Sequence, residues 1–135
     1  MICFFLANVY APCDVRGKRE LWNQLGSFSR SRAKSNLCVC GDFNSVCLEE
    51  ERRSRGMVVR GVDTDFFNSF IADSHLMDFS LGGRHFTWFS GDGLSMSPLD
   101  SFLLSEELSS RWYNCAQIAL QRGLSDHCPH YSQFR

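Results

Sequence analysis

Acidic, amide and imidazole side chains stand at the ends of three apolar segments of the sequence. Asp42 and Asn44 follow the apolar segment 37–41, and because Phe43 separates them, both side chains can point into one cleft. A carboxylate there can orient or deprotonate a water molecule, and an amide can hold an anionic oxygen without adding charge. Alternatively, Asp42 and Asn44 form an Asx turn in which both side chains bond to the local backbone.

An acid and an imidazole are adjacent at Asp126 and His127, just before another apolar segment. This pair could bind a metal ion or a phosphate oxygen and donate a proton, or it could form a simple turn. Asp100 lies alone within the apolar segment 98–104, and a buried carboxylate is costly unless it is paired. We therefore expect Asp100 to pair with His127.

The elements that must position these groups can be read from the hydrophobic pattern. Unbroken apolar runs at 2–10 and 37–41 predict strands that are buried on both faces. Helical spacing predicts a helix at 18–28 that covers the sheet, and a second helix capped by Asp63 and Thr64. Further strands are expected at 85–89, 98–104, 115–120 and 129–134, with a short helix opening at 105–107. This alternation indicates an α/β or α+β fold with helices outside the sheets.

Composition narrows the class of protein. The 135 residues make one domain, 1–135, and 44% hydrophobic residues favour a packed core over disorder. A net charge of −1 excludes nucleic-acid binding by electrostatics alone, so any polyanion site must be local. The odd count of seven cysteines excludes a fully paired disulfide framework, and their spacing does not favour zinc; free thiols indicate an intracellular protein. The apolar segment 2–7 is too short to span a membrane, so no membrane partner is expected.

Five segments, in this order, resemble the endonuclease/exonuclease/phosphatase superfamily, which shares the DNase I-like four-layer α/β sandwich. They are Asn-Val-Tyr-Ala-Pro at 8–12, Gly-Asp-Phe-Asn at 41–44, Phe-Thr-Trp at 86–88, Leu-Asp-Ser-Phe-Leu at 99–103 and Ser-Asp-His at 125–127. The residues of these segments are most similar to those in the nuclease domain of plant LINE-type non-LTR retrotransposons. The resemblance implies the α/β class and a Mg²⁺-dependent endonuclease or phosphodiesterase.

The resemblance also implies a role for each residue of the catalytic set. Asp42 would be the base that prepares a water for in-line attack on phosphorus. Asn44 and Tyr10 would hold the non-bridging oxygens. His127, oriented by Asp100, would contact the scissile phosphate and stabilise developing charge.

Metal and DNA contacts follow from the same resemblance. Asp126 would lie beside Mg²⁺, and Thr87, Arg52 and Arg53 would contact DNA. DNA binding is expected to be weak and local, and the family implies a nuclear location.

Two departures from the family qualify these expectations. The family's first strands, which carry an asparagine and the glutamate that is its main Mg²⁺ ligand, precede the segment at 8–12 and are not in this sequence. Ser101 stands where LINE elements usually have a basic residue. The resemblance therefore implies an N-terminally truncated, incomplete sandwich that lacks its first strands, with weak or no activity. The missing N-terminal part of the same domain would be a natural partner.

Other functions remain open at the level of sequence. The first is an active phosphodiesterase in which Asp126 and water alone hold Mg²⁺. The second is a non-catalytic nucleic-acid-binding or scaffold fragment, whose strongest feature would be the arginines between 52 and 60. Phosphatases of lipid head groups share the fold, but the similarity of the five segments to LINE elements favours a nuclease.

Overall fold

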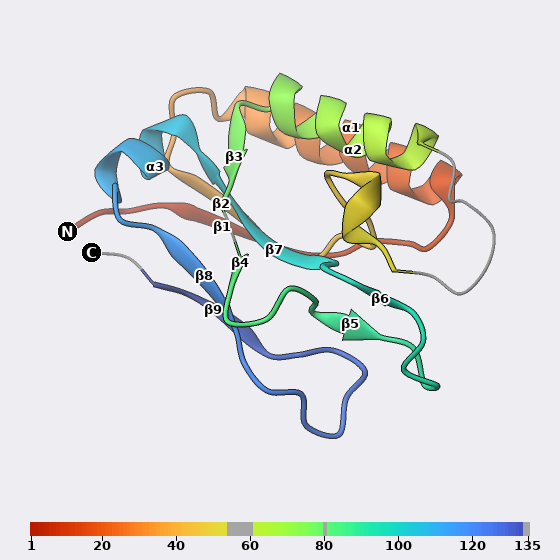
Figure 1. The fold of residues 1–135 in the computed structure, drawn as a ribbon. Coiled ribbons are helices and arrows are strands. Elements are labelled where there is room, and N and C mark those ends of the chain that lie inside the picture. The colour runs from red at the N-terminus through yellow and green to blue at the C-terminus, as the bar shows by residue number, and fades with distance from the viewer. Residues whose placement is uncertain (54–60, 80, 134–135) are drawn as a thin grey trace.

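A four-stranded sheet forms the centre of the molecule, and two helices cover one of its faces (Figure 1). The computed structural model describes residues 1–53, 61–79 and 81–133. In spatial order the strands are β1 (Phe5–Tyr10), β2 (Leu37–Asp42), β7 (Asp100–Ser105) and β3 (Leu76–Asp78). β1 runs parallel to β2, and β7 runs antiparallel to β2 and β3. The covering helices are α1 (Val15–Ser31) and α2 (Val62–Asp73).

Strand β2 is buried on both faces, as the sequence predicts. Leu37 and Val39 join the core beneath the helices, where Trp22 of α1 stacks on Phe70 of α2 at 5.0 Å between ring centroids. Alternate residues of the strand face the other way, because successive side chains of a strand point to opposite faces. The cluster on that second face includes Cys38, Cys40, Phe102, Leu104 and Leu108.

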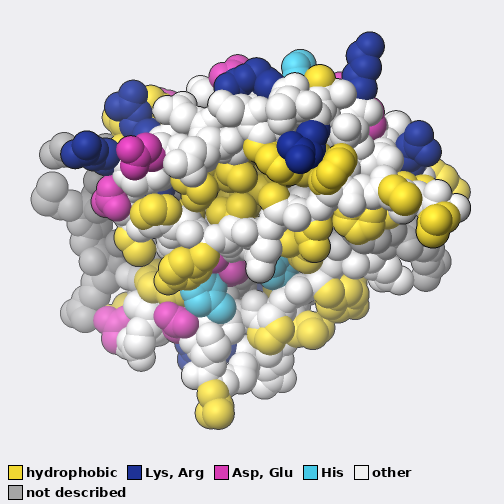
Figure 2. All heavy atoms as spheres, turned by 180° about the vertical axis from the view of Figure 1, so that it is seen from behind, with side chains coloured by type: hydrophobic (Ala, Val, Ile, Leu, Met, Phe, Trp, Pro, Cys, Tyr) yellow, Lys and Arg dark blue, Asp and Glu magenta, His cyan; other side chains and the backbone are white. Residues whose placement is uncertain are grey.

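Strand β1 departs from the expectation that the run 2–10 is buried on both faces. The strand begins at Phe5, and β2 is its only pairing partner in the part of the chain that the structure describes. Val9 faces the helices and is 7% exposed, whereas Leu6 on the other face is 61% exposed. Figure 2 shows hydrophobic side chains gathered in a band across the face opposite to the view of Figure 1. The outer face of β1 is therefore uncovered.

Helix α1 extends beyond the predicted range 18–28 at both ends. Its N-cap is Asp14, whose carboxylate accepts a hydrogen bond from the Gly17 backbone N–H at 2.7 Å. Helix α2 does not begin as predicted, because its N-cap is Gly61 and both Asp63 and Thr64 lie buried in the first turn. The prediction that these two residues cap the helix is wrong, since other polar groups have taken up both side chains.

A second sheet lies on the side of the central sheet away from α1 and α2 (Figure 1). Its strands are β4 (Leu81–Gly82), β8 (Ala116–Ala119) and β9 (His130–Gln133), while β5 (Trp88–Phe89) and β6 (Met96–Ser97) form a separate pair. The strands predicted at 85–89, 115–120 and 129–134 are present but shorter. Gln117 of β8 connects the sheets, because its side-chain oxygen accepts the Phe102 backbone N–H at 2.9 Å.

The remaining helical elements are short. They are the 3-10 helix η1 (Glu49–Glu51) and helix α3 (Glu106–Arg111). Helix α3 begins where the sequence predicts a short helix, and its N-cap is Ser105. None of the helices in the described ranges has the length and apolar character that a membrane crossing requires. Layered helices and sheets thus place the ends of β2 and β7 side by side, where the polar motifs lie.

Candidate active site

The end of strand β2 is shaped by a glycine that no other residue could replace without strain. Gly41 has a φ of +129°, and a Cβ there would lie 2.0 Å from the Val9 carbonyl oxygen of β1. Beyond it, Asp42 is 8% exposed, and its Oδ1 accepts the Asn44 backbone N–H at 2.9 Å. Asn44 takes a left-handed φ of +49°. An Asx turn is therefore present at Asp42, and it uses Oδ1 and leaves Oδ2 to other contacts.

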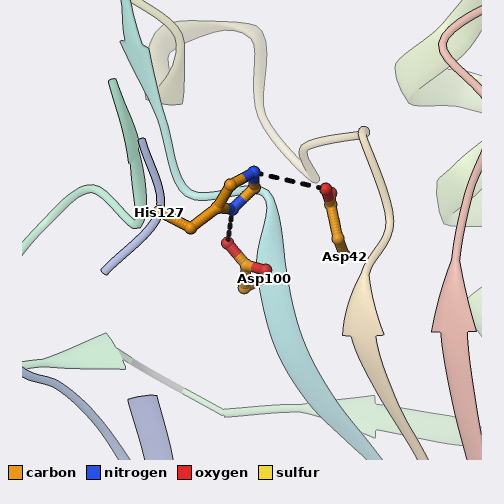
Figure 3. Close-up of side chains that lie close together, drawn as sticks. All are labelled: Asp42, Asp100 and His127. Atoms are coloured by element: carbon orange, nitrogen blue, oxygen red, sulfur yellow. Dashed lines mark hydrogen bonds and ion pairs between the residues drawn. The ribbon is translucent and has the colours of Figure 1, made fainter. Parts of the chain in front are cut away.

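Three side chains from distant parts of the chain meet at this turn (Figure 3). Asp42 and Asp100 are directly opposite each other on β2 and β7. The His127 ring lies between them, with Nδ1 at 2.7 Å from Asp100 Oδ2 and Nε2 at 3.5 Å from Asp42 Oδ2. The predicted pairing of Asp100 with His127 is confirmed. We refer to Asp42, Asp100 and His127 as the His127 cluster.

The Thr87–Trp88 segment contacts Asp100 and His127 and positions them. Thr87 is completely buried at 0% exposure, and its Oγ1 accepts the Asp100 backbone N–H at 3.0 Å. Trp88 forms a β-bridge with His127 and donates its indole N–H to Asp126 at 3.3 Å. The burial of Thr87 contradicts the expectation that it contacts a nucleic acid, because its side chain has no exposed surface. Thr87 instead positions Asp100.

Burial and neighbouring charges shift the pKa values of the cluster. Burial raises the pKa of Asp42, and the charges of Asp100 and Asp126 add to that rise, whereas the Asn44 hydrogen bond and the charge of His127 oppose it. Burial by itself lowers the pKa of His127, but the hydrogen bond and charge of Asp100, together with the charges of Asp42 and Asp126, outweigh it, so that the net pKa is raised. An imidazole with a raised pKa favours its protonated form.

A cleft of about 380 Å³ opens in front of the cluster. It is lined by Tyr10, Cys13, Lys18, Asp42, Asn44, Arg52, Trp88, Ser97, Leu99, Asp126 and His127. Tyr10 is 82% exposed at its rim. The structure thus brings Tyr10, Asp42, Asn44, Asp126 and His127 to one cleft, with Asp100 directly behind the imidazole.

The two arginines that the sequence singles out lie in different places. Arg52 lines the cleft, whereas the Arg53 guanidinium stacks over the Phe86 ring at 5.4 Å and borders a separate depression. Arg53 therefore does not share a site with the His127 cluster. The other predicted arginines, at 55 and 60, lie outside the described residues.

Sequence reasoning missed a buried charge cluster beneath the turn, which we call the Asp63 cluster. The Lys18 ammonium donates to Asp63 Oδ2 at 2.9 Å and to the Asn44 carbonyl oxygen at 2.6 Å. Arg52 donates to the same two oxygens at 3.3 and 3.2 Å, and the Ser45 hydroxyl donates to Asp63 at 3.3 Å. A signal was available, because Lys18 interrupts the apolar stripe of α1 that continues at positions 21, 22 and 25.

The donor atoms fit Mg²⁺ in a limited way. Ligand atoms of Asp42, Asp100 and His127 all lie within 4.8 Å of one another, but Asp100 and His127 are already bonded to each other. Imidazole nitrogen suits Mg²⁺ poorly, whereas a site with one or two carboxylates, water and substrate phosphate is ordinary for this ion. Asp126 is such a carboxylate on the cleft wall, although it is not one of the three grouped residues.

Comparisons with known proteins identify the fold. No family model and no curated protein matches the sequence. The 3′ phosphatase NExo from Neisseria, solved with a product DNA hairpin, matches at a TM-score of 0.72 and 19% identity over 96% of this chain. The chain has the DNase I-like fold. The expected fold is therefore confirmed.

Two further DNase I-like structures match over most of the chain. The AP endonuclease LMAP from Leishmania major gives a TM-score of 0.63 at 19% identity over 89% of this chain. The endonuclease domain of TRAS1, a telomere-specific non-LTR retrotransposon, gives 0.62 at 14% identity over 86%. This chain covers 60% of NExo, 42% of LMAP and 51% of the TRAS1 domain. It therefore spans about half the length of the DNase I-like structures that it matches.

Proposed function

We propose that the cleft is the phosphate-hydrolysing site of a metal-dependent phosphodiesterase that acts on DNA, of the type found in LINE-type retrotransposon endonucleases. The convergence of Asp42 and His127 on one cleft, with Asp100 bonded to the imidazole, carries this proposal, since the three residues come from segments far apart in the sequence. The names of the DNase I-like neighbours, a 3′ phosphatase, an AP endonuclease and a retrotransposon endonuclease, support DNA as the substrate. The family resemblance adds a nuclear location.

The residues of the cluster have complementary chemical roles in such a reaction. Asp42 accepts a proton from the attacking water through Oδ2, and its raised pKa makes it a better base than an ordinary aspartate. His127 donates its Nδ1–H to Asp100, which fixes the ring and leaves Nε2 to face the phosphate. The protonated ring stabilises the charge that develops on the phosphate oxygens.

Two residues of the cleft complete the phosphate site. Asn44 donates one side-chain N–H to the Ala11 carbonyl oxygen at 2.7 Å, so one N–H of the amide is left for a phosphate oxygen. Tyr10 offers its hydroxyl at the rim of the cleft. Both groups hold non-bridging oxygens without adding negative charge.

Binding of the metal ion is expected to be weak in this proposed enzyme. Asp126, with water molecules and the substrate phosphate, would hold Mg²⁺, which supplies charge neutralisation at the phosphate oxygens when bound. The glutamate that serves as the main ligand in the family is not among these 135 residues. A lost metal contribution costs several kcal/mol, at roughly tenfold in rate per 1.36 kcal/mol. The chain by itself is therefore expected to cleave DNA slowly or not at all.

The test is nicking of supercoiled plasmid by the purified chain in millimolar Mg²⁺. Slow nicking that disappears with EDTA and in both Asp42→Ala and His127→Ala supports the proposal. The matched control is Asp65→Ala, which removes an exposed carboxylate of α2 outside the cleft. Nicking that persists in Asp42→Ala would contradict the assignment of the base.

A second candidate is a non-catalytic nucleic-acid-binding or scaffold fragment. It is favoured by Arg52 and Lys18, which place positive charge on the cleft wall of a chain with a net charge of −1. Fluorescence anisotropy with a labelled DNA hairpin separates the two functions. Binding without any nicking under the most sensitive conditions would favour this second candidate, and the absence of both would exclude each of them.

A further inference from the structure

We propose that Lys18 and Arg52 form a second phosphate subsite in the cleft, which binds the phosphodiester next to the scissile one on the same nucleic-acid strand. This inference rests on the proposed function, since it names the part of the substrate that the basic side of the cleft holds. It concerns residues that the proposed hydrolysis does not use.

The Asp63 cluster contains one more positive charge than negative charge. Two cations, Lys18 and Arg52, share one carboxylate, Asp63, and both contact the same Oδ2 atom. The Asn44 carbonyl oxygen also accepts from both cations but carries no formal charge. A surplus cation in a partly buried place is costly unless an anion neutralises it. An anionic ligand in the cleft would supply the missing charge.

Hydrogen-bond donors of Arg52 and Lys18 that have no partner in the described part of the chain also favour an anionic ligand. The Nε of Arg52 is buried and has no hydrogen-bond partner among the described residues. The Lys18 ammonium has three N–H donors, of which Asn44 and Asp63 take two. Unsatisfied buried donors are rare because each costs the desolvation of a polar group, and here both residues line the cleft. Phosphate oxygens are strong acceptors that suit an arginine and a lysine together.

The position of the two cations distinguishes this subsite from the catalytic one. Lys18 and Arg52 contact the Asn44 carbonyl oxygen, whereas Asp42 contacts the Asn44 backbone N–H, which belongs to the preceding peptide group. The charges that act on Asp42 are those of Asp100, His127 and Asp126. Since His127, Lys18 and Arg52 line the same cleft, we expect a strand with one phosphate at His127 to present its next phosphate to the two cations.

The variant Arg52→Gln tests this subsite without dismantling the fold, because Lys18 still contacts both Asp63 and Asn44. The matched control is Arg53→Gln, the adjacent arginine, which borders a different depression. Binding of inorganic phosphate, without divalent metal, is measured by NMR titration. We expect Arg52→Gln to weaken phosphate binding about tenfold and Arg53→Gln to leave it unchanged. The Arg52 Nε–H resonance should move as phosphate is added.

A second arm identifies the source of the phosphate group. The dinucleotide TpT, which has one phosphodiester, should bind with the same dependence on Arg52, and thymidine should not bind. Equal effects of the two arginine variants, an immobile Arg52 Nε–H resonance, or phosphate binding without TpT binding would each overturn the proposal. Failure of the proposed function is distinguishable, since nicking can be absent while this binding persists, and nicking can be present while Arg52→Gln changes no binding.

Discussion

Two carboxylate clusters meet on either side of one turn, and they differ in how completely they are closed. In the Asp63 cluster, the side chains of Lys18 and Asp63 are 5% and 9% exposed, and the contact between them is 2.9 Å. In the His127 cluster, the side chain of His127 is 28% exposed, and its Nε2 lies 3.5 Å from Asp42 Oδ2. The Lys18–Asp63 pair is almost closed to solvent, although Lys18 and Arg52 border the cleft, and we call this cluster closed. The His127 cluster faces the cleft, and we call it open.

The difference in exposure indicates that the two carboxylate clusters serve two purposes. Asp63 accepts hydrogen bonds from α1, from Ser45 and from Arg52, so that it joins three segments of the chain. Removal of the Asp63 charge would leave Lys18 buried without a counter-charge. In the His127 cluster, the imidazole makes a short contact with Asp100 and a longer one with Asp42. Closure stabilises the fold, and the open side leaves polar atoms for a substrate.

The largest effect is expected from Asp63→Asn, which neutralises the anion of the closed cluster. Lys18 would stay buried without a counter-charge, and breaking a buried pair costs about 3–5 kcal/mol. Urea denaturation of the variant should show this loss in the free energy of unfolding. The control Asp65→Asn, an exposed carboxylate in the first turn of the same helix, should cost no more than about 1 kcal/mol.

The same substitution in the open cluster should be mild. Burial already disfavours the charged form of Asp42 and raises its pKa, so Asp42→Asn removes a charge that is costly to bury. The amide oxygen of the new side chain can still accept the Asn44 backbone N–H. We expect the free energy of unfolding to change by less than about 1 kcal/mol. A loss at Asp42 as large as that at Asp63 would erase the distinction between the clusters.

An intermediate effect is expected from Thr87→Val, which keeps the shape of the side chain and removes its hydroxyl. The Asp100 backbone N–H would lose its acceptor at a fully buried position, at a cost of about 1–3 kcal/mol. Denaturation measures the loss, and NMR of the His127 ring should report the displaced Asp100. Unchanged ring resonances would show that Thr87 does not position the open cluster.

A smaller effect is expected in the pH dependence of stability. The pKa of His127 is raised in the folded protein, so the stability it contributes is fully present below the unfolded value near 6.5. That stability is lost as the pH rises through the higher folded value. The raised pKa of Asp42 acts in the same direction at more acidic pH. NMR titration should place the His127 pKa lower in Asp100→Asn than in the unchanged protein, and an equal value would contradict the pairing.

The sequence predicts the open cluster better than the closed one. The segments around Asp42, Asp100 and His127 stand at the ends of apolar strands, so the pairing of Asp100 with His127 could be inferred from the cost of burying a carboxylate. Asp63 reads as a helix cap, because local sequence cannot show that Lys18, 45 residues away, competes for it. Long-range polar contacts of this kind depend on how α1 and α2 pack.

The strands show the same division between local and distant information. The apolar pattern predicts β2 correctly, since one hydrophobic cluster covers each of its two faces. The equally apolar run at 2–10 gives a strand with one exposed face, because burial depends on neighbours that a local pattern does not specify. Composition thus indicates what a segment can bury, and the fold decides what it does bury.

The smallest effect on stability is expected from Leu6→Thr on the uncovered face of β1. Leu6 is 61% exposed, so a β-branched polar residue should change the free energy of unfolding by no more than about 0.5 kcal/mol. Exposed apolar strand edges promote association between chains, and β1 carries no charged residue to oppose it. Light scattering at rising protein concentration should therefore show less aggregation in Leu6→Thr.

A control on the same strand separates the two effects. Val9→Thr makes an equally small change at a residue that faces the helices and is 7% exposed. Because it buries a hydroxyl in the core, it should lower the free energy of unfolding by about 1–3 kcal/mol without reducing aggregation. Aggregation that falls equally in both variants would contradict the assignment to the outer face. The two faces of β1 would then differ in exposure but not in their effect on association between chains.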